Sequence, residues 1–180
     1  MSEPTLRLAA HHDVPAIAVL MRRSVLDSFP FFHDERETAS AARYLTEPDL
    51  NLIDDGTYYV FELDGELVAC GGWSKRAKVY TGTGDLPDDD RMLDPATEPA
   101  RVRAMFVRGD WTRRGLGRAI LDECARAAAA DGYRSLVLMA TSPGVPLYSS
   151  FGFREVARTL VPLPDGVLLA GMTMDYPLGG

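Results

Sequence analysis

The residues best suited to chemistry are the glycines and arginines within residues 101–118, RVRAMFVRGDWTRRGLGR. Gly115 and Gly117 have no Cβ, so a bulky anion can approach the backbone closely at these positions. The first N–H groups of a helix lack internal partners and lie at the positive end of its dipole. Formal positive charge comes from Arg108, Arg113, Arg114 and Arg118. A glycine turn that opens a helix here would bind an anion, and its natural ligand is a diphosphate.

The elements that must position this turn are a strand before it and a helix after it. The sequence predicts a strand over Val102–Val107 and a helix that begins near Gly115 and ends near Gly132. The apolar stripe of the helix consists of Leu116, Ile120, Leu121, Cys124 and Ala125. The apolar run Ser135–Thr141 predicts a buried strand, which can lie parallel to the first one through this helical crossover.

Two common phosphate-binding patterns do not fit the turn. The P-loop pattern requires four residues between its glycines and then Lys, whereas one residue separates Gly115 from Gly117. The dinucleotide fingerprint requires a third small residue at the position of Ile120. On this motif alone, the alternative is a helix that has glycines near its start and binds no phosphate.

The run Thr112–Gly117, TRRGLG, resembles the coenzyme A signature of the GCN5-related N-acetyltransferases, the GNAT family. That signature is Gln/Arg-x-x-Gly-x-Gly/Ala after a strand, and Thr112 stands at its first position. A second motif of the family is Leu-Tyr-x-x-x-Gly-Phe. Its residues here are Leu147, Tyr148, Gly152 and Phe153. Residues 141–144 replace the Asn-x-x-Ala that often precedes it, and the two motifs have the family's separation of one helix and one strand.

The resemblance implies an α/β (α+β) fold of GNAT type, a mixed, mostly antiparallel twisted sheet flanked by helices. A splayed parallel strand pair would lie at the coenzyme site, because the first strand of that pair bulges in the family and pairs with the pantetheine arm. Acetyl-CoA is the implied cosubstrate, with Met105 at its acetyl end and Val107 at its pantetheine. The full set of implied coenzyme contacts is Met105, Phe106, Val107, Thr112, Arg113, Arg114, Gly115, Leu116, Gly117 and Arg118.

The resemblance implies a general acid, but it leaves the general base open. Tyr148 holds the position of the family's general acid, whose hydroxyl can reach the coenzyme sulfur, and the alternative is a helix aromatic with an idle hydroxyl. In some members a Glu serves as the general base at the position of Arg101, and an arginine there cannot accept a proton. The general base is therefore open between Glu98, His33 and water relayed to backbone carbonyls.

The acceptor side is implied by the N-terminal part of the chain. In the resembled family the first two helices and their connection line the acceptor site. The sequence predicts helices over 14–27 and 35–45, joined by a loop rich in Phe. The implied acceptor-pocket residues are Phe31, Phe32, His33 and Tyr44. A plain hydrophobic staple between two helices is the alternative.

Two further hairpins are predicted. Thr57–Leu63 and Glu66–Trp73 flank the turn dipeptide Asp64-Gly65, and the Gly71-Gly72 pair ends the second strand or marks a bulge. Near the C-terminus, 153–161 and 167–176 predict an antiparallel arm.

Residues 80–98 show no periodicity and are predicted to lie outside the core. Their acidic residues either attract a cationic acceptor or are simply solvated: Asp85, Asp88, Asp89 and Asp90.

Composition narrows the class of protein. The length of 180 residues favours one domain over 1–180, and the net charge of −7 argues against non-specific nucleic-acid binding. No apolar run is long enough for a membrane span, and the N-terminus lacks the features of a signal peptide. Cys70 and Cys124 are expected to be buried, reduced thiols of a cytoplasmic protein, and the three His residues do not complete a metal site with them.

Together these features predict an N-acetyltransferase that moves an acetyl group from acetyl-CoA to a primary amine. The expected acceptor is a small molecule, and the expected route is direct transfer in a ternary complex. The alternatives are a protein N-terminal or lysine acetyltransferase, a non-catalytic acyl-CoA sensor, and a diphosphate-binding enzyme of another kind. Homodimers are common among proteins that the chain resembles.

Overall fold

The computed structural model describes residues 2–78 and 89–179 of the chain. Its strands are β1 Thr5–Leu8, β2 Tyr58–Leu63, β3 Glu66–Ser74, β4 Ala100–Val107, β5 Ser135–Thr141, β6 Arg154–Pro162 and β7 Leu168–Pro177. Its α-helices are α1 Val14–Ser28, α2 Glu35–Tyr44, α3 Leu50–Asp54, α4 Leu116–Ala130 and α5 Val145–Phe151. The strands form one sheet in the order β1-β2-β3-β4-β5-β7-β6, antiparallel except for the pair β4–β5. The predicted mixed, mostly antiparallel sheet is thereby confirmed.

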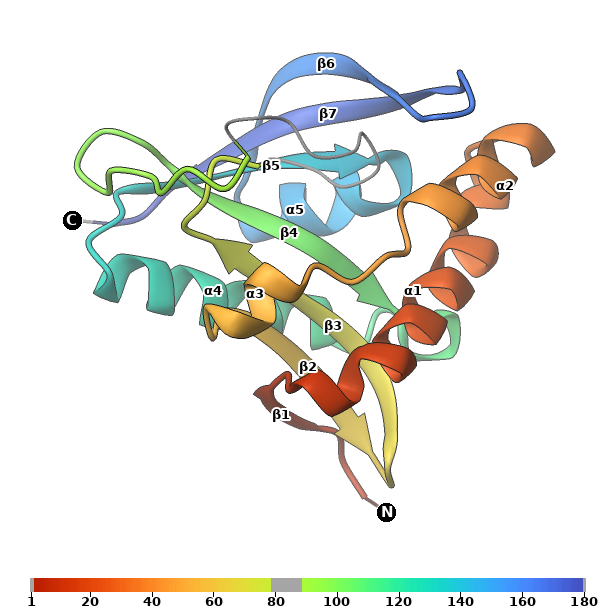
Figure 1. Ribbon diagram of the computed structural model, residues 1–180, viewed down its shortest axis with the longest axis horizontal. Coiled ribbons are helices and arrows are strands. Elements are labelled where there is room, and N and C mark those ends of the chain that lie inside the picture. The colour runs from red at the N-terminus through yellow and green to blue at the C-terminus, as the bar shows by residue number, and fades with distance from the viewer. Residues whose placement is uncertain (1, 79–88, 180) are drawn as a thin grey trace.

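Helices cover both faces of the sheet (Figure 1). Helices α1 and α3 pack on one face, where Ile17 and Leu52 meet Val60 of β2. Helix α4 packs on the other face, where Ile120 and its neighbours meet Phe61 of β2. Because successive side chains of a strand point to opposite faces, β2 serves both cores at once. Among the described helices, none is long and apolar enough to cross a membrane.

The first hairpin has the predicted turn. Asp64 and Gly65 both have positive φ, 49° and 82°, as a two-residue turn of type I′ requires. Strand β3 then runs one residue beyond the predicted end, to Ser74.

Strand β4 carries a bulge opposite Gly71. Cys70 is paired with Phe106 and Gly72 with Arg103, so Gly71 faces two residues of β4, Ala104 and Met105. Ala104 has a φ of 55°, a left-handed conformation that costs a residue with a Cβ about 1–2 kcal/mol. A Cβ on Gly71 would lie 2.7 Å from the sulfur of Met105, so the glycine makes room for the bulge. The predicted bulge is confirmed, and its extra residue lies on β4.

Strands β4 and β5 separate after a short parallel contact. They pair at Ala100 with Leu136 and at Arg101 with Val137, while β5 continues along β7 as far as Thr141. The implied splayed pair is therefore present, and it opens toward the end of β4 that carries the bulge.

The prediction for residues 80–98 was wrong at Leu93. Leu93 is 5% exposed and packs in the core with Trp73. It is drawn inward because its N–H donates to the carbonyl of Lys75, next to a bridge between Arg76 and Met92. Of the acidic run, Asp85 and Asp88 lie outside the described residues.

Candidate active site

The predicted glycine turn opens α4, and its two glycines have different roles. Gly115 precedes the helix with a φ of 83°, a conformation that glycine adopts without strain. Gly117 lies inside the first turn, where a Cβ would come 2.7 Å from the Leu147 side chain of α5. Gly115 thus shapes the backbone that exposes the first amides of α4, and Gly117 lets α5 approach closely.

The arginines around this turn are not equivalent. Arg108 donates to Asp110 at 2.6 and 3.0 Å and to Glu66 at 3.2 Å, so its charge is neutralised. Arg114 stacks over Trp111 at 4.5 Å, and Arg118 lies over the Phe151 ring at 5.4 Å. Within the described ranges, no carboxylate forms an ion pair with three of them: Arg113, Arg114 and Arg118. These three leave net positive charge at the turn, whereas Arg108 does not contribute as expected.

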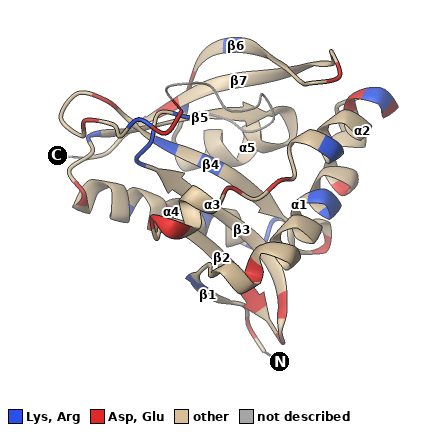
Figure 2. Cartoon of the chain, viewed as in Figure 1, with Lys and Arg blue, Asp and Glu red and all other residues tan. Residues whose placement is uncertain are grey.

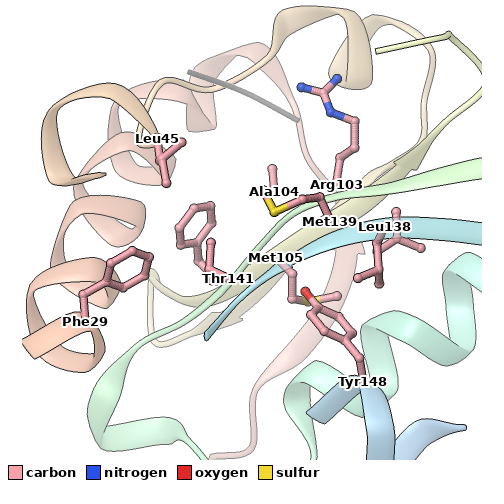
Figure 3. A pocket seen from close by; sticks show the side chains of 11 residues that line it. Phe29, Leu45, Arg103, Ala104, Met105, Leu138, Met139, Thr141 and Tyr148 are labelled. Atoms are coloured by element: carbon pink, nitrogen blue, oxygen red, sulfur yellow. The ribbon is translucent and has the colours of Figure 1, made fainter. Parts of the chain in front are cut away.

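A cavity of about 80 Å³ lies where β4 and β5 separate (Figure 3). Residues 102–106 of β4, which include the bulge, form one wall. Strand β5 contributes Leu138, Met139 and Thr141, and Tyr148 enters from α5. The remaining wall comes from the N-terminal helices, with Phe29 after α1 and Leu45 after α2.

Two buried hydroxyl groups hold β4 beside this cavity. The Tyr58 hydroxyl donates to the carbonyl of Ala104 at 2.6 Å, and the Ser24 hydroxyl donates to the carbonyl of Val107 at 2.9 Å. A Cβ on Gly72 would lie 2.8 Å from the Tyr58 ring, so this glycine makes room for the tyrosine. Sequence reasoning missed both hydroxyls. The Gly71-Gly72 pair was the available signal: it predicts a bulge, and the carbonyl that a bulge displaces needs a hydrogen-bond donor.

Tyr148 is buried and lines the cavity with its ring. Burial raises the pKa of its hydroxyl above the usual 10.0 of tyrosine, so the group keeps its proton at neutral pH. A Cβ on Gly144 would lie 2.9 Å from the Tyr148 ring, so the residue before α5 makes room for it. A protonated phenol in this position can donate a proton.

His33 lies under the N-terminal helices and does not line the cavity. Its side chain is 4% exposed, and its ring lies 5.1 Å from that of Phe29. Nδ1 is 3.8 Å from a carboxylate oxygen of Glu37, and Nε2 is buried without a hydrogen-bond partner among the described residues. In this region the residue that lines the cavity is Phe29, not His33.

Glu98 lies before the start of β4 and is held by a salt bridge. Both of its carboxylate oxygens accept hydrogen bonds from Arg91 at 2.9 Å, and one also accepts from the N–H of Asp94. The Arg91 guanidinium lowers the pKa of Glu98 to about 2, far below the value of a base that works near neutral pH.

The implied acceptor residues do not line the cavity. Phe31 and Phe32 are 84% and 55% exposed, and Tyr44 lies beneath the guanidinium of Arg43. None of the three lines the cavity, and Phe29 and Leu45 do so instead. Sequence reasoning also missed Arg103 and Thr141. Thr141 had a signal, because it opens the run that replaces the Asn-x-x-Ala of the family.

Solved structures with a similar fold cover nearly the whole chain. A GCN5-related N-acetyltransferase from Rhodopseudomonas palustris is 21% identical, with a TM-score of 0.73 over 99% of this chain and 98% of that one. PaiA N-acetyltransferase from Thermoplasma acidophilum, in complex with coenzyme A, is 12% identical, with a TM-score of 0.66 over 98% and 99%. YncA from Salmonella typhimurium, a putative acetyltransferase with acetyl-CoA, is 19% identical, with a TM-score of 0.64 over 99% and 96%. A comparison with curated proteins found no matching sequence.

The fold and the turn are those of an acetyltransferase, which is a kind of acyltransferase. The model of the acetyltransferase (GNAT) domain family matches residues 54–155, from the end of α3 to the start of β6. This range contains the glycine turn and the motif around Tyr148. The chain belongs to the GCN5-related N-acetyltransferase family.

Proposed function

We propose that this protein transfers the acetyl group of acetyl-CoA directly to a primary amine of a small molecule. The observation that carries the proposal is the cavity at the separation of β4 and β5, since it joins the bulge of β4 to the buried Tyr148. We take residues 1–180 as one acetyltransferase domain.

The described residues fit the coenzyme. The first amides of α4 and the guanidinium groups of Arg113, Arg114 and Arg118 suit a diphosphate. Beyond Arg101, β4 is no longer paired with β5, so its backbone can bind the amides of a pantetheine arm. The expected contacts on this strand are Met105, Phe106 and Val107. Around the turn they are Thr112, Arg113, Arg114, Gly115, Leu116, Gly117 and Arg118.

The chemistry follows from this arrangement. Acetyl-CoA supplies a thioester, whose C–S bond breaks as the amine nitrogen forms a C–N bond with the acetyl carbon. A backbone amide at the bulge, at Met105, polarises the acetyl carbonyl. Tyr148 gives its phenolic proton to the departing sulfur, and the proton lost by the amine restores the neutral phenol.

The route of the amine proton is proposed to be water. Among the described residues that line the cavity there is no carboxylate and no imidazole. The earlier candidates lie elsewhere, His33 against Phe29 and Glu98 against Arg91. A water chain to backbone carbonyls of β4 therefore fits better than either side chain.

Homodimerisation and a cytoplasmic location stay predictions. The arm formed by β6 and β7 exposes Val156, Leu160 and Leu168, and such apolar side chains support contact with a second copy. Analytical ultracentrifugation over a range of concentrations tests the dimer.

The proposed function is tested by release of free thiol from acetyl-CoA with a panel of amines. We expect amine-dependent release, and we expect Tyr148→Phe to lower kcat about 100-fold without weakening coenzyme binding. Tyr133→Phe is the matched control, because Tyr133 is also buried but packs against Trp73. Tight coenzyme binding without release on any amine would instead support the sensor alternative.

A further inference from the structure

Arg103 is a buried arginine on the wall of the cavity, and two of its three guanidinium nitrogens have no hydrogen-bond partner among the described residues. It is 4% exposed, and its Nη1 donates to Asp49 at 2.6 Å. Its Nε and Nη2 are buried and have no hydrogen-bond partner within residues 2–78 and 89–179. Buried donors are satisfied in almost all folded proteins, so two on one side chain call for a ligand.

The unused atoms form one edge of the guanidinium. Nε–H and Nη2–H point in parallel from the same side of the planar group, and their spacing matches the two oxygens of a carboxylate. Asp49 fixes the orientation of this edge from behind, because its other oxygen caps α3 by accepting from the N–H of Asn51 at 2.9 Å.

Other arginines of the chain, such as Arg76 and Arg108, show the same edge in use. In Arg76, Nε and Nη2 both donate to Asp55 at 2.8 Å. In Arg108, the same two atoms donate to Asp110 at 2.6 and 3.0 Å. Arg103 therefore differs from both, because its Nε and Nη2 are buried and no carboxylate of the described residues accepts from them.

We propose that Arg103 binds the carboxylate of the acceptor, so that the acceptor is an amino acid or a similar amine with a carboxylate nearby. This inference rests on the proposed acetyl transfer and names the class of its acceptor. In Figure 3, Arg103 and Tyr148 lie on opposite sides of Met105, with the guanidinium of Arg103 directed away from Tyr148. An acceptor held at Arg103 by its carboxylate can thus turn its amine toward the bulge at Met105.

The rest of the cavity favours an apolar side chain on this acceptor. Phe29, Leu45, Phe106 and Met139 form apolar walls. Figure 2 shows basic residues on β4, whereas β5 beside it carries no charge. Arg103 thus supplies the positive charge in a site that is otherwise largely apolar.

The test compares matched acceptors: leucine, its carboxamide, and isopentylamine, which lacks the carboxylate. Each is assayed by thiol release with wild type and with Arg103→Lys, which keeps the charge and loses the two-donor edge. We expect wild type to favour leucine over leucinamide in kcat/KM by about tenfold or more, and Arg103→Lys to remove this preference through KM. The ratio between variants cancels the different basicity of the amines. Arg76→Lys is the control and keeps the preference.

The outcomes separate the two proposals. Amine-dependent release with no preference for the carboxylate overturns the role of Arg103 and leaves acetyl transfer standing. Without release on any amine, acetyl transfer fails, and the melting temperature with N-acetylleucine against its amide then decides whether Arg103 binds carboxylates. The same ligand pair on wild type also decides the matter should Arg103→Lys fail to fold or to bind coenzyme.

Discussion

The proposed coenzyme side and the proposed acceptor side of this molecule are built in different ways. The coenzyme side uses the backbone of one continuous stretch, in which β4 ends at Val107 and α4 begins at Leu116 after Gly115. The proposed acceptor side is the cavity, which is lined by side chains from distant segments, such as Phe29, Leu45 and Arg103. Backbone recognition leaves a local pattern in the sequence, whereas side-chain convergence depends on the whole fold.

The largest expected effect separates two neighbouring phenylalanines on the acceptor side. Phe29→Ala removes a buried ring from the cavity wall and from the core beneath α2, so we expect a loss of about 3–5 kcal/mol in the free energy of unfolding. Phe31→Ala removes an exposed ring and should change it by less than about 0.5 kcal/mol. Chemical denaturation measures both, and equal losses would restore Phe31 as a packed residue of the acceptor side.

The next effect probes the coenzyme side. Arg113→Glu/Arg114→Glu reverses two charges that no described carboxylate neutralises, so we expect the Kd for coenzyme A to rise about 100-fold. Arg36→Glu/Arg43→Glu on α2 changes the net charge equally and should leave the Kd nearly unchanged. Calorimetric titration at two salt concentrations distinguishes them. Unaltered affinity in the first variant would remove the diphosphate from the glycine turn.

The smallest effect concerns the bulge that both sides share. Tyr58→Phe removes the hydrogen bond to the Ala104 carbonyl, so we expect a loss of about 1 kcal/mol in stability. We also expect a drop in kcat larger than for Tyr133→Phe, because the bulge positions the amide at Met105. Normal turnover in a destabilised Tyr58→Phe protein would mean that the bulge keeps its conformation without this hydrogen bond.

The sequence allowed prediction wherever local rules decide the structure. The strand Ser135–Thr141 and the turn at Asp64-Gly65 lie where apolar runs and turn chemistry placed them. The left-handed φ of Ala104 could not be predicted, since alanine carries no signal for it and the bulge depends on Gly71 in another strand. Leu93 was missed for a similar reason, because contacts with Lys75 rather than any periodicity draw it into the core.

The candidate site divides in the same way. The motifs around Gly115 and Tyr148 were visible in the sequence, and the cavity contains Met105 and Tyr148 from that set. Arg103 looked like one charged residue in a strand, and its proposed role rests on Asp49 and on two nitrogens that have no partner among the described residues. No spacing rule connects residues that meet only after the sheet has formed.

The short contact between β4 and β5 bears on cohesion of the whole sheet. The pairs at Ala100 and Arg101 join β1–β4 to β5–β7, and beyond them the halves part. A ligand that binds β4 in this gap and also contacts α5 ties the halves together. By thermodynamic linkage it stabilises the folded chain by RT ln(1 + [L]/Kd). Amide hydrogens along the open edge of β4 would then exchange more slowly as the cosubstrate concentration rises. The rigidity of the sheet would thus depend in part on the concentration of its ligand.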